Sequence, residues 1–156
     1  MCSFYIWDVV IIKRCCAFGH REIFNDISED VYNVVMNEIN AGIEIFYCGC
    51  MGSFDNSFAY AVSKAKKNNP NIKLICVKPY MTKELNYLRY YYEELYDDII
   101  IPSEIKGCHY KSAITLRNKW MVDLCDSVIF YLKREYGGTY TAYKYAKRKN
   151  KKITII

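Results

Sequence analysis

Short apolar runs recur along the chain and are separated by segments whose apolar residues follow a helical period. Several runs are nearly continuous in Val, Ile, Phe and Cys, which is typical of strands buried on both faces of a parallel sheet. They occupy Ile11–Phe18, Glu44–Cys48, Lys73–Val77, Asp98–Ile101, Ser127–Leu132 and Lys152–Ile156. The pattern therefore predicts six strands.

The intervening segments predict helices. In the first of them, Ile27, Val31, Val35 and Ile39 recur every three or four residues, and Gly42 follows as a C′ residue. The other helical segments are Phe58–Ala65, which ends before Asn69-Pro70, then Leu85–Leu95, Ser112–Cys125 and Thr141–Lys149. Each lies between two of the predicted strands.

Strands that alternate with helices predict an α/β fold of Rossmann-like type, with a mostly parallel sheet and helices on both faces. The length of 156 residues fits a single domain. We assign this domain to residues 11–156, preceded by an N-terminal extension or extra strand at residues 1–10.

Three of the predicted strand-to-helix turns are rich in glycine. They are Gly19–Glu22, Cys48–Asp55 and Tyr136–Thr141, and they contain five of the seven glycines. In an open parallel sheet, ligands bind beyond the carboxyl ends of the strands, where free N–H groups of the following helices can hold a phosphate. Together the turns favour a ligand that carries a phosphate.

Arg117 lies on the apolar face of the predicted helix Ser112–Cys125. A guanidinium on that face needs an anion, because an unpaired buried charge is costly. One partner is a phosphate or carboxylate of the ligand. The alternative is an internal ion pair with Glu22, Asp55 or Asp123. Neighbouring Asn118 either faces the ligand or caps locally.

The eight cysteines lie largely within apolar runs, where a free Cys behaves as a small core residue. This favours reduced thiols and a cytoplasmic protein over a disulfide framework. Cys48 and Cys50 are too close together for a usual zinc pair, and neither His20 nor His109 lies at ligand spacing from a cysteine pair. We therefore expect no metal and no cofactor.

The formal net charge is +5, and much of it is concentrated near the C-terminal end of the sequence, in Lys144, Lys147, Arg148, Lys149, Lys151 and Lys152. Cations at the end of a helix complement its dipole and stay solvated. We prefer this interpretation to a nucleic-acid surface, because no aromatic stacking pattern accompanies the charge. Nucleic acid is therefore not an expected partner.

The apolar runs are far too short to span a bilayer, and the N-terminal stretch has neither the basic region nor the cleavage site of a signal peptide. A membrane is accordingly not an expected partner. Tyrosine is overused, at 16 residues, with a cluster at Tyr90–Tyr92. Such a cluster favours a subunit contact over a ligand site.

Several pieces of the chain follow one another in the order of a known family. They are Phe18-Gly19-His20-Arg21, Gly49–Asp55, Lys73–Tyr80, Arg117–Asp123, and Gly137-Gly138-Thr139 followed by Tyr145-Ala146. In these the chain resembles the SLOG superfamily, which joins Smf/DprA-like and Lonely Guy (LOG) proteins, and within it a stand-alone branch of small bacterial proteins. The resemblance implies a Rossmann-like sheet that binds nucleotides or nucleotide-derived signals, commonly as a homodimer or higher homo-oligomer.

Lonely Guy enzymes hydrolyse the N-glycosidic bond of nucleoside monophosphates with an arginine and a glutamate. Arg117 falls in the place of that arginine, whereas after Gly138-Thr139 the chain continues Tyr140-Thr141 and the glutamate is absent. Breaking a glycosidic bond needs a carboxylate to stabilise the sugar cation or to activate water. If the protein is an enzyme, Asp55 or Glu22 from another loop takes that role beside Arg117.

Three functional hypotheses remain. The preferred one is a non-catalytic binder of a nucleotide, ADP-ribose or a cyclic-nucleotide-type signal, acting as a stand-alone sensor or by sequestering its ligand, as family relatives in bacterial immunity sense nucleotide messengers. The alternatives are a nucleoside-phosphate N-glycosidase and a DprA-like DNA-binding protein. The candidate ligand-binding residues are Gly19, His20, Arg21, Gly49, Met51, Gly52, Asp55, Arg117, Asn118, Gly137, Gly138, Thr139, Tyr140 and Thr141.

Overall fold

A computed structural model describes residues 10–156 of the chain. The N-terminal extension or extra strand expected at residues 1–10 therefore lies, apart from Val10, outside the described residues. Within residues 10–156, no helix is long and apolar enough to cross a membrane.

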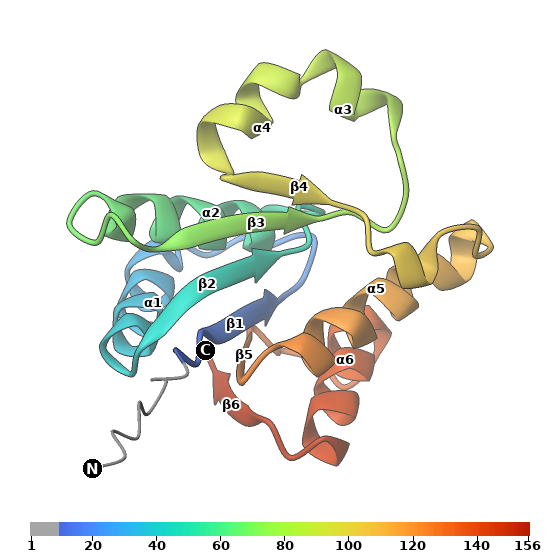
Figure 1. The fold of residues 1–156 in the computed structure, drawn as a ribbon. Helices are drawn as coiled ribbons and strands as arrows, with labels where there is room; N and C mark the ends of the chain where they lie inside the picture. The colour runs from blue at the N-terminus through green and yellow to red at the C-terminus, as the bar shows by residue number, and fades with distance from the viewer. Residues whose placement is uncertain (1–9) are drawn as a thin grey trace, which may run out of the picture.

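Six strands form one sheet in which every neighbouring pair is parallel (Figure 1). They are β1 (Lys13–Phe18), β2 (Ile43–Cys48), β3 (Lys73–Val77), β4 (Asp98–Ile100), β5 (Ser127–Phe130) and β6 (Lys152–Ile155), in the order β4-β3-β2-β1-β5-β6. The predicted strands and the Rossmann-like fold class are confirmed. The first strand begins two residues later than predicted, because Ile11 and Ile12 are exposed and unpaired.

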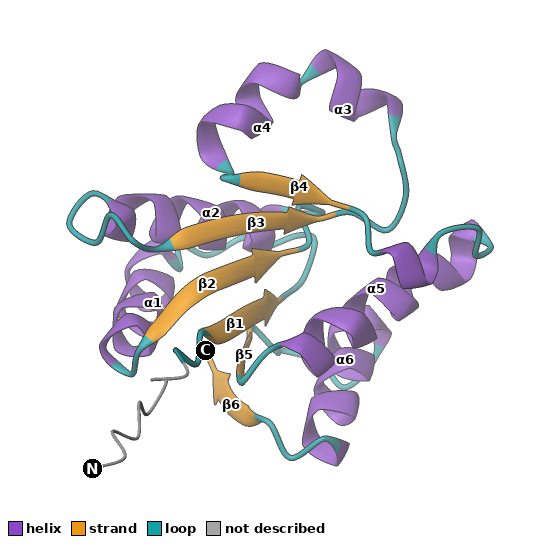
Figure 2. Ribbon diagram, in the orientation of Figure 1, coloured by secondary structure: helices purple, strands orange, loops and turns teal. Residues whose placement is uncertain are grey.

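The helices are α1 (Ser28–Asn40), α2 (Ser53–Lys66), α3 (Lys83–Tyr87), α4 (Arg89–Leu95), α5 (Tyr110–Leu124) and α6 (Gly137–Arg148), with a 3-10 turn at Ser103–Ile105 (Figure 2). Several of them differ from the sequence prediction, and α2 begins at Ser53, five residues before the predicted segment. The stripe Leu85–Leu95 is divided at Leu88, and α3 and α4 arch beyond β4 with Tyr92 as their one buried residue. Helix α6 begins at Gly137 rather than Thr141, so both glycines lie in its first turn.

The two faces of the sheet are covered by different helices. In β1, Cys15 and Ala17 point into the core beneath α1 and α2, whereas Cys16 and Phe18 point into the core beneath α5 and α6. Successive side chains of a strand face opposite sides, so a strand covered on both sides is apolar at nearly every position. For this reason the central strands appear in the sequence as continuous apolar runs.

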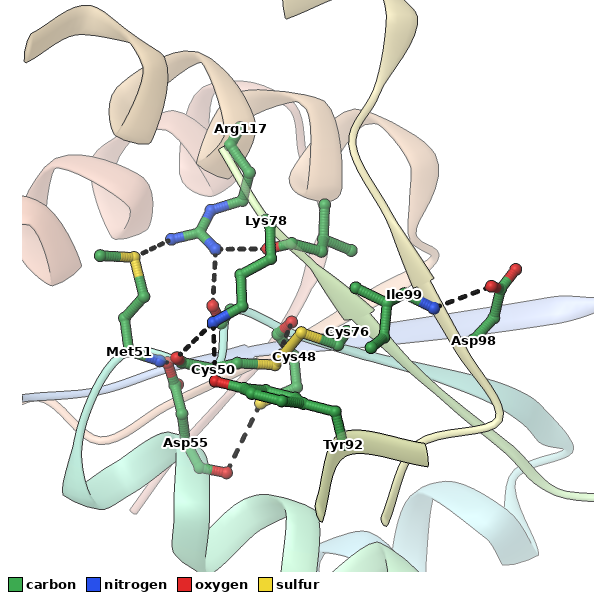
Figure 3. The surroundings of a disulfide bond; sticks show 12 residues. Cys48, Cys50, Met51, Asp55, Cys76, Lys78, Tyr92, Asp98, Ile99 and Arg117 are labelled. Atoms are coloured by element: carbon green, nitrogen blue, oxygen red, sulfur yellow. Dashed lines mark hydrogen bonds between the residues drawn. A yellow bond between two sulfur atoms is a disulfide. The ribbon is translucent and has the colours of Figure 1, made fainter. Parts of the chain in front are cut away.

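The cysteines differ in part from the expectation. Cys15, Cys16, Cys48 and Cys125 are buried free thiols, and burial raises the pKa of the first three. Cys50 and Cys76, in contrast, form a disulfide that joins the turn after β2 to β3 (Figure 3). The prediction that all the cysteines are reduced is therefore wrong for this pair, which meets only because β2 and β3 are neighbours.

Candidate functional site

The order of the strands reverses at β1. From β1 the chain continues to β2, β3 and β4 on one side, and then crosses through α5 to β5 on the other side of β1 (Figure 1). In parallel sheets this switch point, at the carboxyl ends of the strands, is where ligands bind. A pocket of about 390 Å³, called the main pocket here, lies there and is walled by α5 and by the segments after β1, β2 and β5.

The main pocket brings together eleven of the fourteen candidate residues. Those lining it are Gly19, His20, Arg21, Gly49, Met51, Asp55, Arg117, Asn118, Gly137, Gly138 and Thr139. Three others do not line it: Gly52 packs under the backbone of Arg21, Tyr140 stacks on Tyr143, and the Thr141 hydroxyl donates to the Gly137 carbonyl. Glu22 is exposed and also lies outside the pocket.

Seven lining residues were missed by sequence reasoning. They are Ala17, Phe18, Lys111, Ile114, Thr115, Arg134 and Tyr136. A signal for three of them is present in the sequence, since Lys111, Ile114 and Thr115 share a helix face with Asn118, which they precede by seven, four and three residues respectively. Tyr136 immediately precedes the glycines of the third turn, and Arg134 lies two residues before Tyr136.

Arg117 is 4% exposed and reaches from α5 across the ends of β2 and β3. Its Nη1 donates to the carbonyls of Gly49, at 2.9 Å, and Val77, at 2.6 Å, while its Nη2 contacts the Met51 sulfur at 3.5 Å (Figure 3). Its Nε donates to Asn118 Oδ1 at 2.8 Å, so Asn118 positions the guanidinium.

The partners of Arg117 are thus neutral. Within residues 10–156 it forms no ion pair with Glu22, Asp55 or Asp123, the three internal partners considered above. Burial lowers the pKa of the guanidinium, and nearby Asp55 partly offsets that effect. An arginine that is buried among carbonyls and a sulfur keeps an unneutralised charge, which favours an anion in the adjoining pocket.

The glycines around the pocket serve two purposes. A Cβ at Gly19 would overlap the Phe54 ring, and one at Gly49 would lie 2.8 Å from Arg117 Nη1, so these glycines make room for the protein itself. Gly137 and Gly138, in contrast, have nothing within 4 Å of an added Cβ. The first turn of α6 therefore presents an open backbone to the pocket, where the free N–H groups of a helix N-terminus favour an anion.

Asp55 lies in the first turn of α2, and its Oδ2 accepts a hydrogen bond from the Met51 N–H at 2.7 Å. This bond closes the turn in which Cys50 has a φ of 57°. Burial raises the pKa of the Asp55 carboxyl despite that bond and the nearby Arg117. Among the lining residues in the described chain, Asp55 is the one carboxylate, against Arg21, Lys111, Arg117 and Arg134.

His20 is buried, and its Nε2 accepts a hydrogen bond from the Lys133 N–H at 3.0 Å. Burial, together with the charges of Arg134 and Lys133, lowers the pKa of the imidazole. The ring is therefore neutral at pH 7 and carries its proton on Nδ1. Thr139 holds the start of α6 to the end of β1, since its hydroxyl donates to the Gly19 carbonyl at 2.9 Å.

Comparisons with known proteins were made at the level of sequence and of structure. No family model matches the sequence, and a search of curated proteins finds no match. Among solved structures, DNA processing protein A (DprA) from Streptococcus pneumoniae superposes with a TM-score of 0.68 at 16% identity, over 92% of this chain and 50% of that one. The chain therefore shares the fold of that DprA structure.

A second protein of this fold is DprA from Helicobacter pylori, which has a unique single-stranded DNA binding mode. It superposes with a TM-score of 0.67 at 16% identity, over 92% of this chain and 64% of that one. The chain thus spans half to just under two thirds of the two DprA chains. The expectation that excluded nucleic acid is wrong, because a protein of the same fold binds single-stranded DNA.

The physical reason for that error lies on α6. No aromatic pattern was expected beside the C-terminal cations, but the helix pairs them with tyrosines. Lys144 lies 4.9 Å from the ring centre of Tyr140, and Lys147 lies 5.5 Å from that of Tyr143. Arg148 lies 5.3 Å from the ring centre of Tyr145. Tyr140, Tyr143, Lys144 and Lys147 thus form a mixed face of cations and aromatic rings, which a linear charge count does not reveal. The Tyr145 ring lies apart from this face, since its hydroxyl donates to Asp123 of α5.

Proposed function

We propose that the main pocket binds a nucleotide through its phosphate. The observation that carries this proposal is the buried Arg117, which faces the pocket with neutral partners only, next to the open first turn of α6. A phosphate in the pocket would accept hydrogen bonds from the one remaining N–H of Arg117 and from the free N–H groups of α6, and would neutralise a buried charge.

The rim of the pocket supports the same ligand class. Arg21, Lys111 and Arg134 are exposed there and attract an anion from solution. Tyr136 is 67% exposed on the rim, with Arg134 5.0 Å from its ring centre, and offers an aromatic face to a base. A protein built in this way holds a free nucleotide as a sensor or by sequestering it.

Single-stranded DNA is the second candidate ligand, since its backbone also carries phosphates. The observation that favours it is the α6 face of alternating tyrosines and cations, which starts at the pocket. Bases of a single strand stack on such rings while the cations contact the backbone. The single-stranded DNA binding of the Helicobacter pylori protein, which shares the fold of this chain, supports this candidate.

One titration series separates the two sources. We would measure the affinity of the pure protein for AMP by calorimetry and for a fluorescent oligo-dT strand by anisotropy. Arg117→Ala is expected to weaken AMP binding by more than ~2 kcal/mol, about thirtyfold, because it removes a buried donor to a charged group. The double variant Lys144→Glu/Lys147→Glu is expected to spare AMP, and to abolish DNA binding if the strand follows α6.

A control is needed because Arg117 also joins the ends of β2 and β3. Arg134→Ala alters an exposed rim residue and leaves the core untouched, so weaker AMP binding by this variant has no folding explanation. Unchanged AMP affinity in both folded variants would refute the phosphate site.

Hydrolysis of the glycosidic bond would depend on Asp55, since Glu22 lies outside the pocket. The protein would be incubated with AMP, ADP-ribose or NAD and filtered, and the filtrate and the heat-released fraction would be analysed by chromatography. Intact nucleotide in the heat-released fraction supports a binder. Free base in the filtrate, abolished in the isosteric Asp55→Asn variant, would instead identify an N-glycosidase.

A further inference from the structure

A second, smaller cavity of about 180 Å³ adjoins the main pocket and is called the side pocket here. Arg21 and Met51 line both cavities and so form the wall between them. The other lining residues are Cys50, Lys78, Pro79, Tyr80, Thr82 and Glu84. The side pocket thus lies beyond the end of β3, on the same edge of the sheet as the main pocket.

Lys78 is the buried basic residue of the side pocket and is 4% exposed. Its Nζ donates to the Cys50 carbonyl and to the Tyr92 hydroxyl, both at 3.1 Å (Figure 3). In the described part of the chain it has no carboxylate within ion-pair distance. One of its three N–H donors is therefore left without a protein partner, and its charge is not neutralised by a contact.

The charges between the two cavities do not balance. Lys78 and Arg117 are both buried cations with neutral hydrogen-bond partners, and Asp55 is the carboxylate whose charge acts on both of them. Arg21 adds a third cation on the shared wall. A single phosphate beside Arg117 leaves Lys78, on the other side of Met51, without an anion. A buried cation without a counter-charge is costly.

Thr82 supplies an independent observation. It occupies the N-cap position of α3, where a threonine hydroxyl usually accepts a backbone N–H. Here its Oγ1 makes no capping bond, and the atom is buried without any hydrogen-bond partner among residues 10–156. An unsatisfied buried hydroxyl is destabilising, and Thr82 lines the side pocket, so rotation of its side chain toward a bound anion would give the hydroxyl an acceptor. Glu84, the carboxylate in the lining, is exposed and therefore screened by solvent.

We infer that the side pocket is a second anion subsite, so that the ligand carries two phosphoryl groups. One lies beside Arg117 in the main pocket and the other is held by Lys78 and Thr82. The inference rests on the proposed phosphate site. Two ligands have this chemistry: a nucleoside diphosphate, in which the phosphoryl groups are joined directly, and a dinucleotide segment of a single strand, in which a nucleoside separates them.

The test uses three probes, AMP, ADP and the dinucleotide pdApdA, with calorimetry on the full chain. At least one of the two bis-phosphorylated probes is expected to bind more tightly than AMP, and the one that does identifies the source. Thr82→Val, which keeps the shape and removes the hydroxyl, is expected to weaken that probe about tenfold, the usual loss for a hydrogen bond to a charged group, and to leave AMP within twofold. Lys78→Met is expected to show the same selectivity with a larger loss.

The matched control is Thr154→Val on β6, which lies in neither cavity. Because the Thr82 hydroxyl is unsatisfied, Thr82→Val is expected to melt no lower than wild type, so a loss of affinity has no folding explanation. Equal effects on AMP and on the bis-phosphorylated probes, or no effect on either, would overturn the second subsite. Failure of AMP itself to bind wild type would overturn the main phosphate site instead.

Discussion

Gly49 and Gly138 look equivalent in the sequence, since both follow a strand and precede a helix. In the structure, the guanidinium of Arg117 occupies the space that a Cβ at Gly49 would need. Gly138, in contrast, has nothing within 4 Å of an added Cβ and lines the main pocket. Gly138 also has no positive φ that would require glycine. A side chain at Gly138 is therefore compatible with the fold, and the space beside it is available to a ligand.

Gly138→Ala is accordingly expected to raise the free energy of unfolding by ~0.5–1 kcal/mol, because alanine favours the helix, while weakening AMP binding, because its methyl enters the pocket. Chemical denaturation and calorimetry measure the two effects. Gly49→Ala is the contrasting variant and is expected to lower both stability and affinity, since its methyl displaces Arg117. If Gly138→Ala binds AMP as tightly as wild type, the first turn of α6 does not contact the ligand.

His20 makes stability depend on pH. Its pKa in the folded protein is lowered by burial and by Arg134 and Lys133, so between that value and the ordinary value near 6.5 the unfolded chain binds more protons. Stability is therefore lost as pH falls below about 6.5. We expect His20→Gln, which keeps an acceptor for the Lys133 N–H, to show a smaller loss between pH 7.5 and 5.5 in urea titrations. A loss in this variant equal to that of wild type would show that another group carries the pH dependence.

The burial of Arg117 could be predicted from the sequence, because its position on the apolar face of a helix is a local property. Its partners could not. The carbonyls of Gly49 and Val77 meet the guanidinium only where the ends of β2 and β3 converge, 68 and 40 residues away in the chain. The same holds for Glu38, which is buried on α1 because Ser127 and Lys152 donate to it from β5 and β6.

At the scale of elements, the strands were predicted to within two residues, because burial on both faces leaves an apolar run. The helices followed less closely. The apolar stripe Leu85–Leu95 predicted one helix, but α3 has no buried residue and α4 has only Tyr92. A stripe without a surface to pack on does not hold a continuous helix. For α6 the local sequence predicted too little helix. Two glycines disfavour a helical start, but in the folded protein α6 nevertheless begins at Gly137.

The poor packing of α3 and α4 has a measurable consequence. Segments with few buried apolar contacts open locally at low cost. In hydrogen exchange followed by mass spectrometry, at a protein concentration where the chain is monomeric, residues 83–91 are expected to exchange much faster than the core of α2, where Phe58, Ala61 and Val62 are buried. Protection of residues 83–91 equal to that of α2 would show that another surface covers them in solution.

At the scale of the molecule, alternation of strands and helices predicts a parallel sheet but not the order of its strands. The order decides where the site lies, because the main pocket exists only where β5 returns beside β1. The sequence located the pocket by its glycine turns, not by topology. It missed Arg134 and Tyr136, which reach the pocket only because the segment after β5 lies against the end of β1.

The exposed tyrosines of the molecule bear on its assembly. Tyr87 and Tyr90 are 84% and 83% exposed on α3 and α4, and Tyr91 lies beside Tyr60 of α2. Adjoining exposed aromatic side chains are typical of protein interfaces, so we propose that the chain forms a homodimer through this surface.

The double variant Tyr90→Lys/Tyr91→Lys is therefore expected to reduce the mass measured by light scattering from roughly twice 18.4 kDa to that of one chain. Lysines at the centre of such a contact would place like charges opposite each other across a two-fold axis. Phe24→Lys alters a side chain that is 93% exposed and belongs to none of these helices, and it is expected to leave the dimer intact. A wild-type mass of one chain would contradict the dimer itself. A dimer that persists in the double variant would place its interface elsewhere and leave the tyrosines of α3 and α4 available to a different partner.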